Sequence, residues 1–425
     1  MELCQVFCLF ICSASLTFSG SLGQHESKTM DRWTRQSLPV LLDTHTEYLK
    51  PALFGGQEEK KERAGTETFC GIECQSGRPP MDQEERERNL GYETMYENGT
   101  RTRTDVTLVY SNRTFAGRPS PSPTHTRRKR QVYGEDGRFV ITESHYITNY
   151  PFSSAVRVSR RCSGILISPK HVLTAAHCVH NGREYLAHAP RARVGVLQLR
   201  SRKGQDGQRR GRGSKDDKGE NQVVEEAGRG GKRKRLRRSA ESERQPVFRW
   251  TRVKHIRIPQ GWTQNRSSTS SLAADYDYAV LELRHSVRQK YMELGVAPPE
   301  AALARIHFSG YDADKSLHDG GGKQKVVYRF CSVVKESDDL LYQHCDAQPG
   351  ATGAGVYVRL RREAGDTGGK GRWQRRVIGV FSGHRRVETE GGGRRDYNVA
   401  VRITPLKYAQ ICHWIHSDPS PCKEI

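Results

Sequence analysis

Residues 162–179 read CSGILISPKHVLTAAHCV, and this stretch decides the fold. Its first part, SGILISP, is rich in aliphatic residues and ends at a proline, which predicts a short strand followed by a turn. After the turn, His177 stands directly before Cys178, and Cys162 lies 16 residues upstream of Cys178. A lone histidine is usually a surface or packing residue, but histidine is also the commonest general acid or base. His177 is therefore the first candidate catalytic residue.

Two further motifs lie downstream of His177. The segment DYDYAVLEL places Asp277 directly before an apolar run of the alternating kind that predicts a strand, whereas Asp275 stands two residues too early for the same position. The segment QPGATGAG, residues 348–355, places Thr352 among glycines and alanines. Glycines at this density predict a tight turn.

These motifs, in the order His177, Asp277 and Thr352, resemble the trypsin-like serine proteases. The resemblance implies that His177 is the general base, that Asp277 is the buried carboxylate that orients its imidazole, and that Cys162 and Cys178 form a disulfide. The His177–Asp277 interval is 100 residues, and removing 41 inserted residues, 200–240, leaves 59, which suits that fold.

The nucleophile loop departs from the family pattern Gly-Asp-Ser-Gly-Gly-Pro. Residues 350–355 read Gly-Ala-Thr-Gly-Ala-Gly, so threonine replaces the serine and Gly355 replaces the proline. By resemblance, the backbone N–H groups of Gly350 and Thr352 form an oxyanion hole. Threonine carries two heavy atoms on Cβ, so its χ1 is stiff and its methyl competes for the space that the hydroxyl needs. Proficient threonine nucleophiles use a chain N-terminus, and Thr352 is internal.

The family's activating ion pair is also missing from the sequence. In trypsin-like enzymes a new N-terminal amine pairs with the aspartate before the serine, but here that residue is Ala351 and the processed chain would begin at Gln131. Both departures resemble the secreted serine protease 23/35 branch of the family. This resemblance implies a secreted, catalytically inactive homologue that acts by binding a protein or peptide ligand. Weak endopeptidase activity through Thr352 is the alternative.

Substrate preference is not encoded in an obvious pocket residue. Asp346 lies six residues before Thr352, where trypsin has the acid at the floor of its specificity pocket. Cys345 does not fall where trypsin's neighbouring cysteine does, so we expect a different local path and do not predict a pocket for Arg or Lys.

The strand pattern supports an all-β fold. From Arg138 onward, nine short segments rich in Val, Ile and Tyr follow one another without a long helix between them, among them AVRVS and RVIGVFSG. This favours a β-sandwich or barrel, and the family resemblance specifies two antiparallel six-stranded β-barrels. A C-terminal helix is expected after Thr404, an N-cap residue followed by Pro405.

The N-terminal part of the chain reads as leader and propeptide. Residues 1–23 have the apolar core and small residues of a secretory signal peptide, and no run of 18 apolar residues follows, so we expect secretion without a membrane anchor. Residues 24–130 are polar and end in RRKR, which predicts convertase cleavage after Arg130 or else a solvated basic patch. Glycosylation motifs are present at Asn98, Asn112 and Asn265.

The cysteines outside the leader form four pairs that are local in sequence. An even number in a secreted chain predicts disulfides, and we expect Cys331 with Cys345 and Cys412 with Cys422. A zinc site at Cys70 and Cys74 is disfavoured, because no second ligand pair lies nearby, and the pairing of these two cysteines stays open. We expect neither a metal ion nor another cofactor.

Residues 200–240 form a basic insertion. They contain 15 Lys/Arg and 6 Asp/Glu, and 15 − 6 gives +9, within a chain of net charge +22. Too few apolar residues are present to offset chain ordering, so we expect a disordered surface loop with a second convertase site after Arg238. Charge alone is also typical of nucleic-acid binding, but the leader and glycosylation motifs argue against that and favour a heparin-like glycosaminoglycan. The alternative is a loop that serves only solubility.

Overall fold

The computed structural model describes most of the chain between residues 38 and 422, all of it within one compact unit, residues 35–425. The described residues are 38–50, 80–110, 137–159, 161–199, 246–263, 272–298, 305–313, 324–362, 372–388, 394–418 and 420–422. Several predicted features lie outside them: the leader 1–23, the insertion 200–240 with Arg238, Cys70, Cys74, Asn112, Arg130, Gln131 and Asn265.

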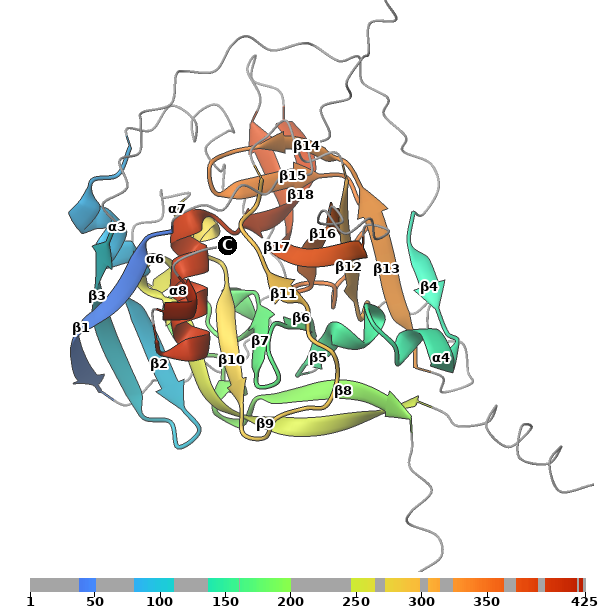
Figure 1. Ribbon diagram of the computed structural model, residues 1–425, viewed down its shortest axis with the longest axis horizontal. Coiled ribbons are helices and arrows are strands. Elements are labelled where there is room, and N and C mark those ends of the chain that lie inside the picture. The colour runs from blue at the N-terminus through green and yellow to red at the C-terminus, as the bar shows by residue number, and fades with distance from the viewer. Residues whose placement is uncertain are drawn as a thin grey trace, which may run out of the picture. The chain divides into compact units, whose positions relative to one another are not determined.

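The first sheet closes into a six-stranded barrel (Figure 1). The strands follow the order β9-β10-β7-β6-β5-β8, and β8 pairs back onto β9. All of these pairings are antiparallel. The six strands are β5 (Ala155–Val158), β6 (Cys162–Leu166), β7 (His171–Thr174), β8 (Arg193–Leu199), β9 (Pro246–Pro259) and β10 (Ala279–Leu283).

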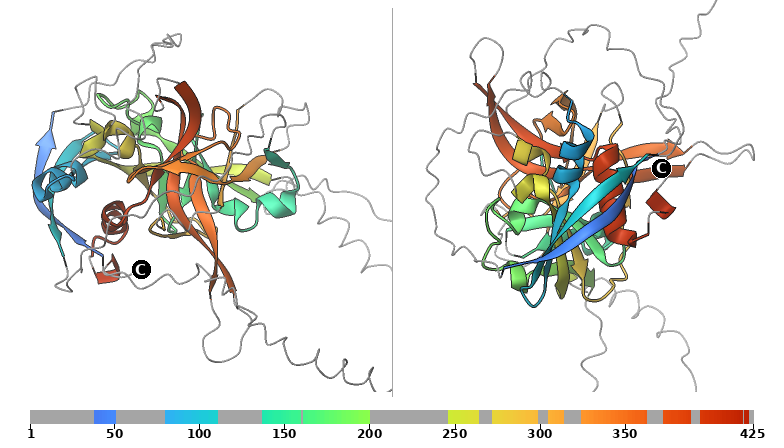
Figure 2. Two further views of the ribbon diagram at one scale, coloured as in Figure 1. Left: turned by 90° about the horizontal axis from the view of Figure 1, so that it is seen from above. Right: turned by 90° about the vertical axis from the view of Figure 1, so that its left-hand side faces the viewer.

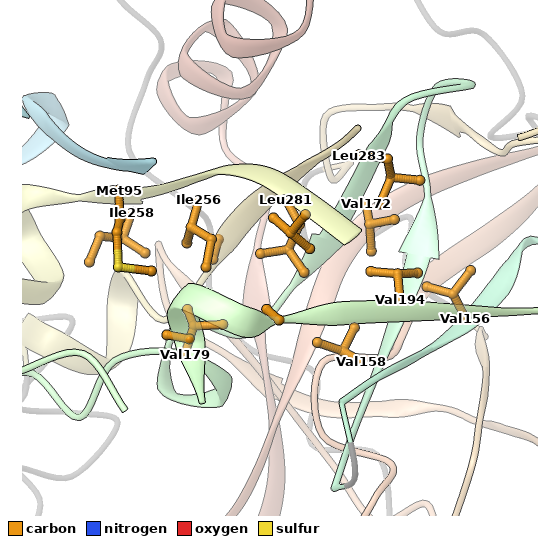
Figure 3. Packing of buried hydrophobic residues seen from close by; sticks show 14 of the residues in the cluster. Met95, Val156, Val158, Val172, Val179, Val194, Ile256, Ile258, Leu281 and Leu283 are labelled. Carbon is orange, nitrogen blue, oxygen red and sulfur yellow. The ribbon is translucent and has the colours of Figure 1, made fainter. Parts of the chain in front are cut away.

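Aliphatic side chains fill this first barrel (Figure 3). Successive residues of a strand point to opposite faces, so Val194 and Val196 of β8 share the inner face, as do Ile256 and Ile258 of β9. Each of these side chains is at most 2% exposed. Residues 162–179 contribute Val172 on β7, which pairs across the sheet with Leu281 on the neighbouring strand β10.

The second sheet forms the other barrel. Its path runs β14-β15-β18-β17-β16-β12-β13, and β13 and β14 are separated along the chain by Ser332 alone, so one bent strand joins the two ends of the path. Two short strands lie beside it: β4 (Phe139–Ile141) pairs with β13, and β11 (Glu293–Leu294) pairs with β17. The barrel strands are β12 (Ile306–Gly310), β13 (Val326–Cys331), β14 (Val333–Glu336), β15 (Leu340–Gln343), β16 (Gly355–Arg362), β17 (Arg372–Glu388) and β18 (Arg394–Arg402).

The region before the cleavage motif, residues 24–130, was expected to be a polar, propeptide-like segment, and its described part contains regular structure. Strands β2 (Tyr92–Tyr96), β3 (Arg101–Val109) and β1 (Val40–Leu49) extend the first sheet outward from β9, and helix α3 (Gln83–Leu90) lies between β1 and β2 in the chain. Strand β3 was not predicted from the sequence, because two of its buried positions are Thr102 and Thr104 rather than aliphatic residues.

The C-terminal helix α8 (Pro405–His416) is present and begins as expected. The Thr404 side chain accepts a hydrogen bond from the Lys407 N–H, and Pro405 occupies the first turn. This helix contacts both β1 and α3, and Figure 2 shows it beside the N-terminal strands. Trp414 of α8 meets the edge of Tyr92 of β2, with ring centroids 5.5 Å apart.

Short helices and disulfides complete the described structure. The short α-helices are α4 (Ser144–Ile147), α6 (Gln260–Thr263) and α7 (Leu272–Asp275), and the 3₁₀ turns are η1 (Phe152–Ser154), η2 (Ala176–Cys178), η3 (Ala189–Arg191) and η6 (Ser420–Cys422). The three expected disulfides are present: Cys162–Cys178, Cys331–Cys345 and Cys412–Cys422. Of the helices in the described part of the chain, none has the length and apolar character needed to cross a bilayer.

Candidate active site

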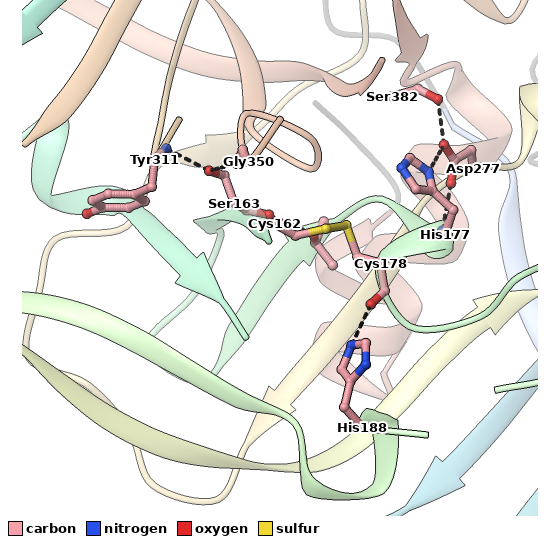
Figure 4. Close-up of a disulfide and its surroundings, with 10 residues drawn as sticks. Cys162, Ser163, His177, Cys178, His188, Asp277, Tyr311, Gly350 and Ser382 are labelled. Atoms are coloured by element: carbon pink, nitrogen blue, oxygen red, sulfur yellow. Dashed lines mark hydrogen bonds and ion pairs between the residues drawn. A yellow bond between two sulfur atoms is a disulfide. The ribbon is translucent and has the colours of Figure 1, made fainter. Parts of the chain in front are cut away.

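His177 and Asp277 form a hydrogen-bonded pair at the edge of the first barrel (Figure 4). His177 lies on η2, where the Cys162–Cys178 disulfide anchors the next residue to β6. Asp277 directly precedes Tyr278 and β10. The His177 Nδ1–Asp277 Oδ2 distance is 2.7 Å, and the His177 backbone N–H donates to Asp277 Oδ1 at 2.9 Å. Asp277, and not Asp275 at the end of α7, is thus the carboxylate that contacts His177.

A third residue, Ser382, holds the same carboxylate. It lies on β17, is buried, and donates its hydroxyl to Asp277 Oδ2 at 2.5 Å. The sequence analysis treated its segment, RVIGVFSG, as a strand and did not single out the serine. A serine within a strand carries no local signal of this role, because its partner lies 105 residues away.

Asp277 is suited to fix the orientation of the His177 ring. Burial alone raises the pKa of this fully enclosed carboxyl, but the His177 charge and the hydrogen bonds from His177 and Ser382 outweigh burial, so the pKa lies below its ordinary value. The ionised carboxylate accepts the proton on Nδ1, which leaves Nε2 as the basic atom. The His177 side chain is 38% exposed, and the Trp262 ring lies beside it at 6.4 Å between centroids.

Backbone hydrogen bonds tie the loop that carries Thr352 to β6 and to β17. The Ser163 N–H donates to the Thr352 carbonyl at 2.7 Å, and the Gly353 N–H donates to the Phe381 carbonyl, directly before Ser382, at 2.8 Å. Gly353 has φ +84°, and a Cβ there would lie 2.2 Å from Thr174 Oγ1. The loop therefore packs against the end of β7, close to His177. Within the described residues, the His177 ring hydrogen-bonds to Asp277 and not to Thr352.

The turn before Thr352 has the form of an oxyanion hole. Gly350 has φ +103°, and a Cβ there would lie 2.4 Å from the Tyr311 carbonyl, so only glycine fits. Ser163 Oγ donates to the Gly350 carbonyl at 2.7 Å and accepts the Tyr311 N–H at 2.8 Å (Figure 4). No acceptor among the described residues takes the N–H of Gly350 or Thr352. With respect to the described residues, both N–H groups are available to a ligand oxygen.

Two other departures in the loop have a structural setting. Ala351 is fully buried, so the residue before Thr352 offers a methyl group where the family has a carboxylate. A Cβ at Gly355 would lie 2.3 Å from the Ile165 side chain. The family's proline therefore does not fit at this position unless Ile165 moves.

Asp346, six residues before Thr352, is exposed, and its Oδ2 accepts the Gly137 backbone N–H at 2.7 Å.

A buried ion cluster supports the Gly350 turn from behind. The Asp312 carboxylate is fully buried, and its Oδ2 lies 3.1 Å from Arg138 Nη1 and 2.5 Å from Arg329 Nη2. The Ala313 N–H donates to the Pro349 carbonyl at 2.7 Å, which ties the residue after Asp312 to the residue before Gly350. Arg138 belongs to the segment that leads from the cleavage motif into β4, so this segment contributes to the ordering of the turn.

Of the three predicted glycosylation sites, Asn98 lies within the described residues. Asn98 is exposed in the turn between β2 and β3, where its side chain accepts the Thr100 N–H at 3.0 Å. Where residues are described, no group of three or more His, Cys, Asp or Glu could hold a metal ion.

Comparison with known proteins places this site in a family. The family model described as "Trypsin" matches residues 139–222. "Inactive serine protease 35" of Mus musculus is 44% identical over 400 residues, covering 92% of this chain and 92% of that protein. "Serine protease 23" of Homo sapiens is 40% identical over 421 residues, covering 98% of each. A solved structure described as "Structure of Glu endopeptidase in complex with MPD" aligns with a TM-score of 0.41 and 18% identity, covering 68% of this chain and 100% of that chain. The relatives show that the chain belongs to the trypsin-like serine proteases, in the branch that contains inactive serine protease 35 and serine protease 23.

Proposed function

We propose that this protein is a secreted pseudoprotease, which binds a protein or peptide in its protease-like cleft without hydrolysing it. The observation that carries the proposal is Thr352 at the nucleophile position, beside a His177–Asp277 pair of full hydrogen-bond geometry. Secretion rests on the leader-like residues 1–23.

The threonine is constrained from both sides of its backbone. Its carbonyl is held by the Ser163 N–H, and the next N–H, that of Gly353, is held by Phe381, so the backbone cannot shift easily to make room for the methyl group. If the hydroxyl turns toward His177, the methyl group takes space beside the substrate carbonyl. A placement error of about 1 Å costs roughly 10²-fold in rate.

The buried Ala351 supports the same conclusion. A new amine at Gln131 would find no carboxylate beside Thr352, so cleavage after Arg130 does not activate the site by the family's usual route. The printed name of one similar protein, "Inactive serine protease 35", agrees with this proposal.

The remaining groups of the site favour a role in ligand binding. The exposed His177 ring, the Trp262 ring beside it and the unoccupied N–H groups of Gly350 and Thr352 offer polar and aromatic contacts to an extended peptide. A peptide carbonyl oxygen at these N–H groups is the contact that the geometry favours most.

The secreted protein is expected to show no peptide hydrolysis and no labelling by a fluorophosphonate probe. We expect Thr352→Ser to restore little of either, since Ala351 and Gly355 remain in place. The measurement compares wild type, His177→Ala, Thr352→Ser and Thr352→Ser with His177→Ala, before and after convertase treatment. Wild-type turnover of a peptide library that His177→Ala abolishes would overturn the proposal and establish the alternative, a weak threonine-dependent endopeptidase.

A second candidate function is glycosaminoglycan binding through the insertion. Residues 200–240 carry a charge of +9 and connect β8 to β9. Cationic side chains act weakly one at a time and are screened over roughly 8 Å at physiological salt, so the cluster must act together. A variant lacking 200–240 is expected to elute from heparin at lower salt than the full chain, and so is protein cleaved after Arg238. Equal elution would leave the insertion a loop that serves only solubility.

A further inference from the structure

We propose that a groove outside the active site binds a sulfated glycan through residues of the barrels themselves. The groove has a volume of about 1470 Å³ and is lined by the β8–β9 ribbon, the segment after β10 and the residues around α4. In Figure 1, strands β8 and β9 run along the bottom of the view. The inference extends the second candidate function but concerns different residues, all of them described.

The charge of the groove has one sign. Its lining contains five cations and no carboxylate, which gives +5. All five are exposed: Arg249, Arg252, Arg284, Arg288 and Lys290. Only Arg284 has an ion-pair partner among the described residues, Glu97 at 3.5 Å, and both of these side chains are about half exposed. Four cations therefore face solvent without a described carboxylate to neutralise them, and they repel one another until an anion binds.

The backbone that carries these cations is held in place. Gly195 of β8 pairs with Trp250 of β9, which fixes the strand between Arg249 and Arg252. The Arg284 N–H donates to the Arg252 carbonyl at 3.0 Å, and the Val287 N–H donates to the Pro169 carbonyl at 2.8 Å, so the segment after β10 is tied to the first barrel. A cationic surface on a fixed backbone loses little conformational entropy when an anion binds.

The uncharged lining favours a glycan over an acidic peptide. The lining also contains the amides and hydroxyls of Asn149, Gln198, Gln289 and Thr251, which can exchange hydrogen bonds with sugar hydroxyls. Trp250 offers a flat apolar face that is 43% exposed. Guanidinium groups bind planar pairs of anionic oxygens through two parallel hydrogen bonds, a geometry that a sulfate also offers. Leu199, the last described residue before the +9 insertion, lines the groove, so a long, uniformly charged chain is the polyanion that fits best.

The test compares two variants of equal net charge on heparin. The groove variant carries Arg249→Ala, Arg252→Ala, Arg288→Ala and Lys290→Ala. The control variant removes four exposed cations that do not line the groove, Arg161, Arg183, Arg191 and Arg395. Both are made in the full chain and in a chain lacking 200–240. In both backgrounds we expect the groove variant to bind heparin on the order of 10²-fold more weakly than the control. Equal elution of the two variants would overturn the inference.

The two backgrounds separate this groove from the insertion. If deletion of 200–240 removes all heparin binding and the groove variant matches the control in the full chain, the groove inference fails and the second candidate function stands. If the groove variant loses binding while the deletion has no effect, the groove inference stands and the second candidate function fails. Polyglutamate that competes as well as heparin at equal charge would overturn the glycan assignment. Should the fourfold variant not fold, Arg288→Ala with Lys290→Ala, both outside any strand, gives the same comparison against Arg161→Ala with Arg183→Ala.

Discussion

Cleavage after Arg130 is expected to leave residues 38–109 bound to the rest of the protein rather than to release them. The sequence analysis treated this region as a polar propeptide, but its described part is an extension of the first barrel. Strand β2 pairs antiparallel with β9 from Tyr92↔Pro259 to Tyr96↔His255. Met95 of β2 belongs to the barrel core (Figure 3).

The apolar side chains of this region are buried in the folded protein, in part against the first barrel and α8. Seven of its apolar side chains are at most 7% exposed: Leu38, Leu41, Leu90, Tyr92, Met95, Val106 and Leu108. Full burial of one such side chain contributes about 1.5–3 kcal/mol, and allowing for a compact unfolded state the set contributes on the order of 10 kcal/mol.

Polar contacts fix the same region to α8. Gln410 of α8 donates to the Leu90 carbonyl, and Asp43 of β1 accepts from His413 at 2.9 Å and from Tyr92 at 3.0 Å. Burial acts to raise the pKa of Asp43, but the hydrogen bond and charge of His413 lower it below its ordinary value. A carboxyl with a lowered pKa stabilises the folded state above its unfolded pKa, and this contribution is lost as the pH falls through the folded value.

The measurement is native gel filtration of the cleaved protein, with an Arg130→Ala variant as the uncleaved control. Both chains should co-elute at the volume of the control, while a denaturing gel shows two bands. Residues 131–425 expressed alone should aggregate, because the open edge of β9 and the Trp414 ring lose their cover. Separate elution of the two chains would contradict the first expectation, and a folded, monomeric 131–425 fragment would contradict the second.

What the sequence predicts well here is local. The pair His177 and Asp277, the disulfide at Cys178 and the N-cap at Thr404 each sit in a short motif whose chemistry is visible within a few residues. Each of them is where its motif indicates.

What the sequence missed depends on contacts between distant segments. Ser382 has no motif of its own, and its role exists only because β17 passes Asp277. Strand β3 buries threonines, so its alternation of buried and exposed positions is not an alternation of apolar and polar residues. Such strands become visible only when the partner strand is known, because β-propensity depends on what each face packs against.

The second large effect is expected from Asp312→Ala, which removes the carboxylate between two buried guanidinium groups. The Arg329 side chain is 1% exposed and that of Arg138 is 8% exposed, so neither can replace the lost partner with bulk water. Breaking a buried ion pair on one side costs about 3–5 kcal/mol, since the remaining charge stays in a medium of low polarity. We expect the free energy of unfolding, measured by urea denaturation, to fall by about this amount.

The control for this prediction is Asp396→Ala, which breaks an exposed pair of similar length. Asp396 accepts from Arg386 at 3.0 Å, and both side chains are about half exposed, so water solvates each charge after the substitution. Exposed pairs contribute about 0–1 kcal/mol. Equal losses in the two variants would show that the Asp312 cluster is solvated and would contradict the prediction.

The same substitution is also expected to loosen the Gly350 turn, because the N–H of the residue after Asp312 donates to the Pro349 carbonyl. Hydrogen exchange at residues 348–353 should therefore rise in Asp312→Ala and stay unchanged in Asp396→Ala.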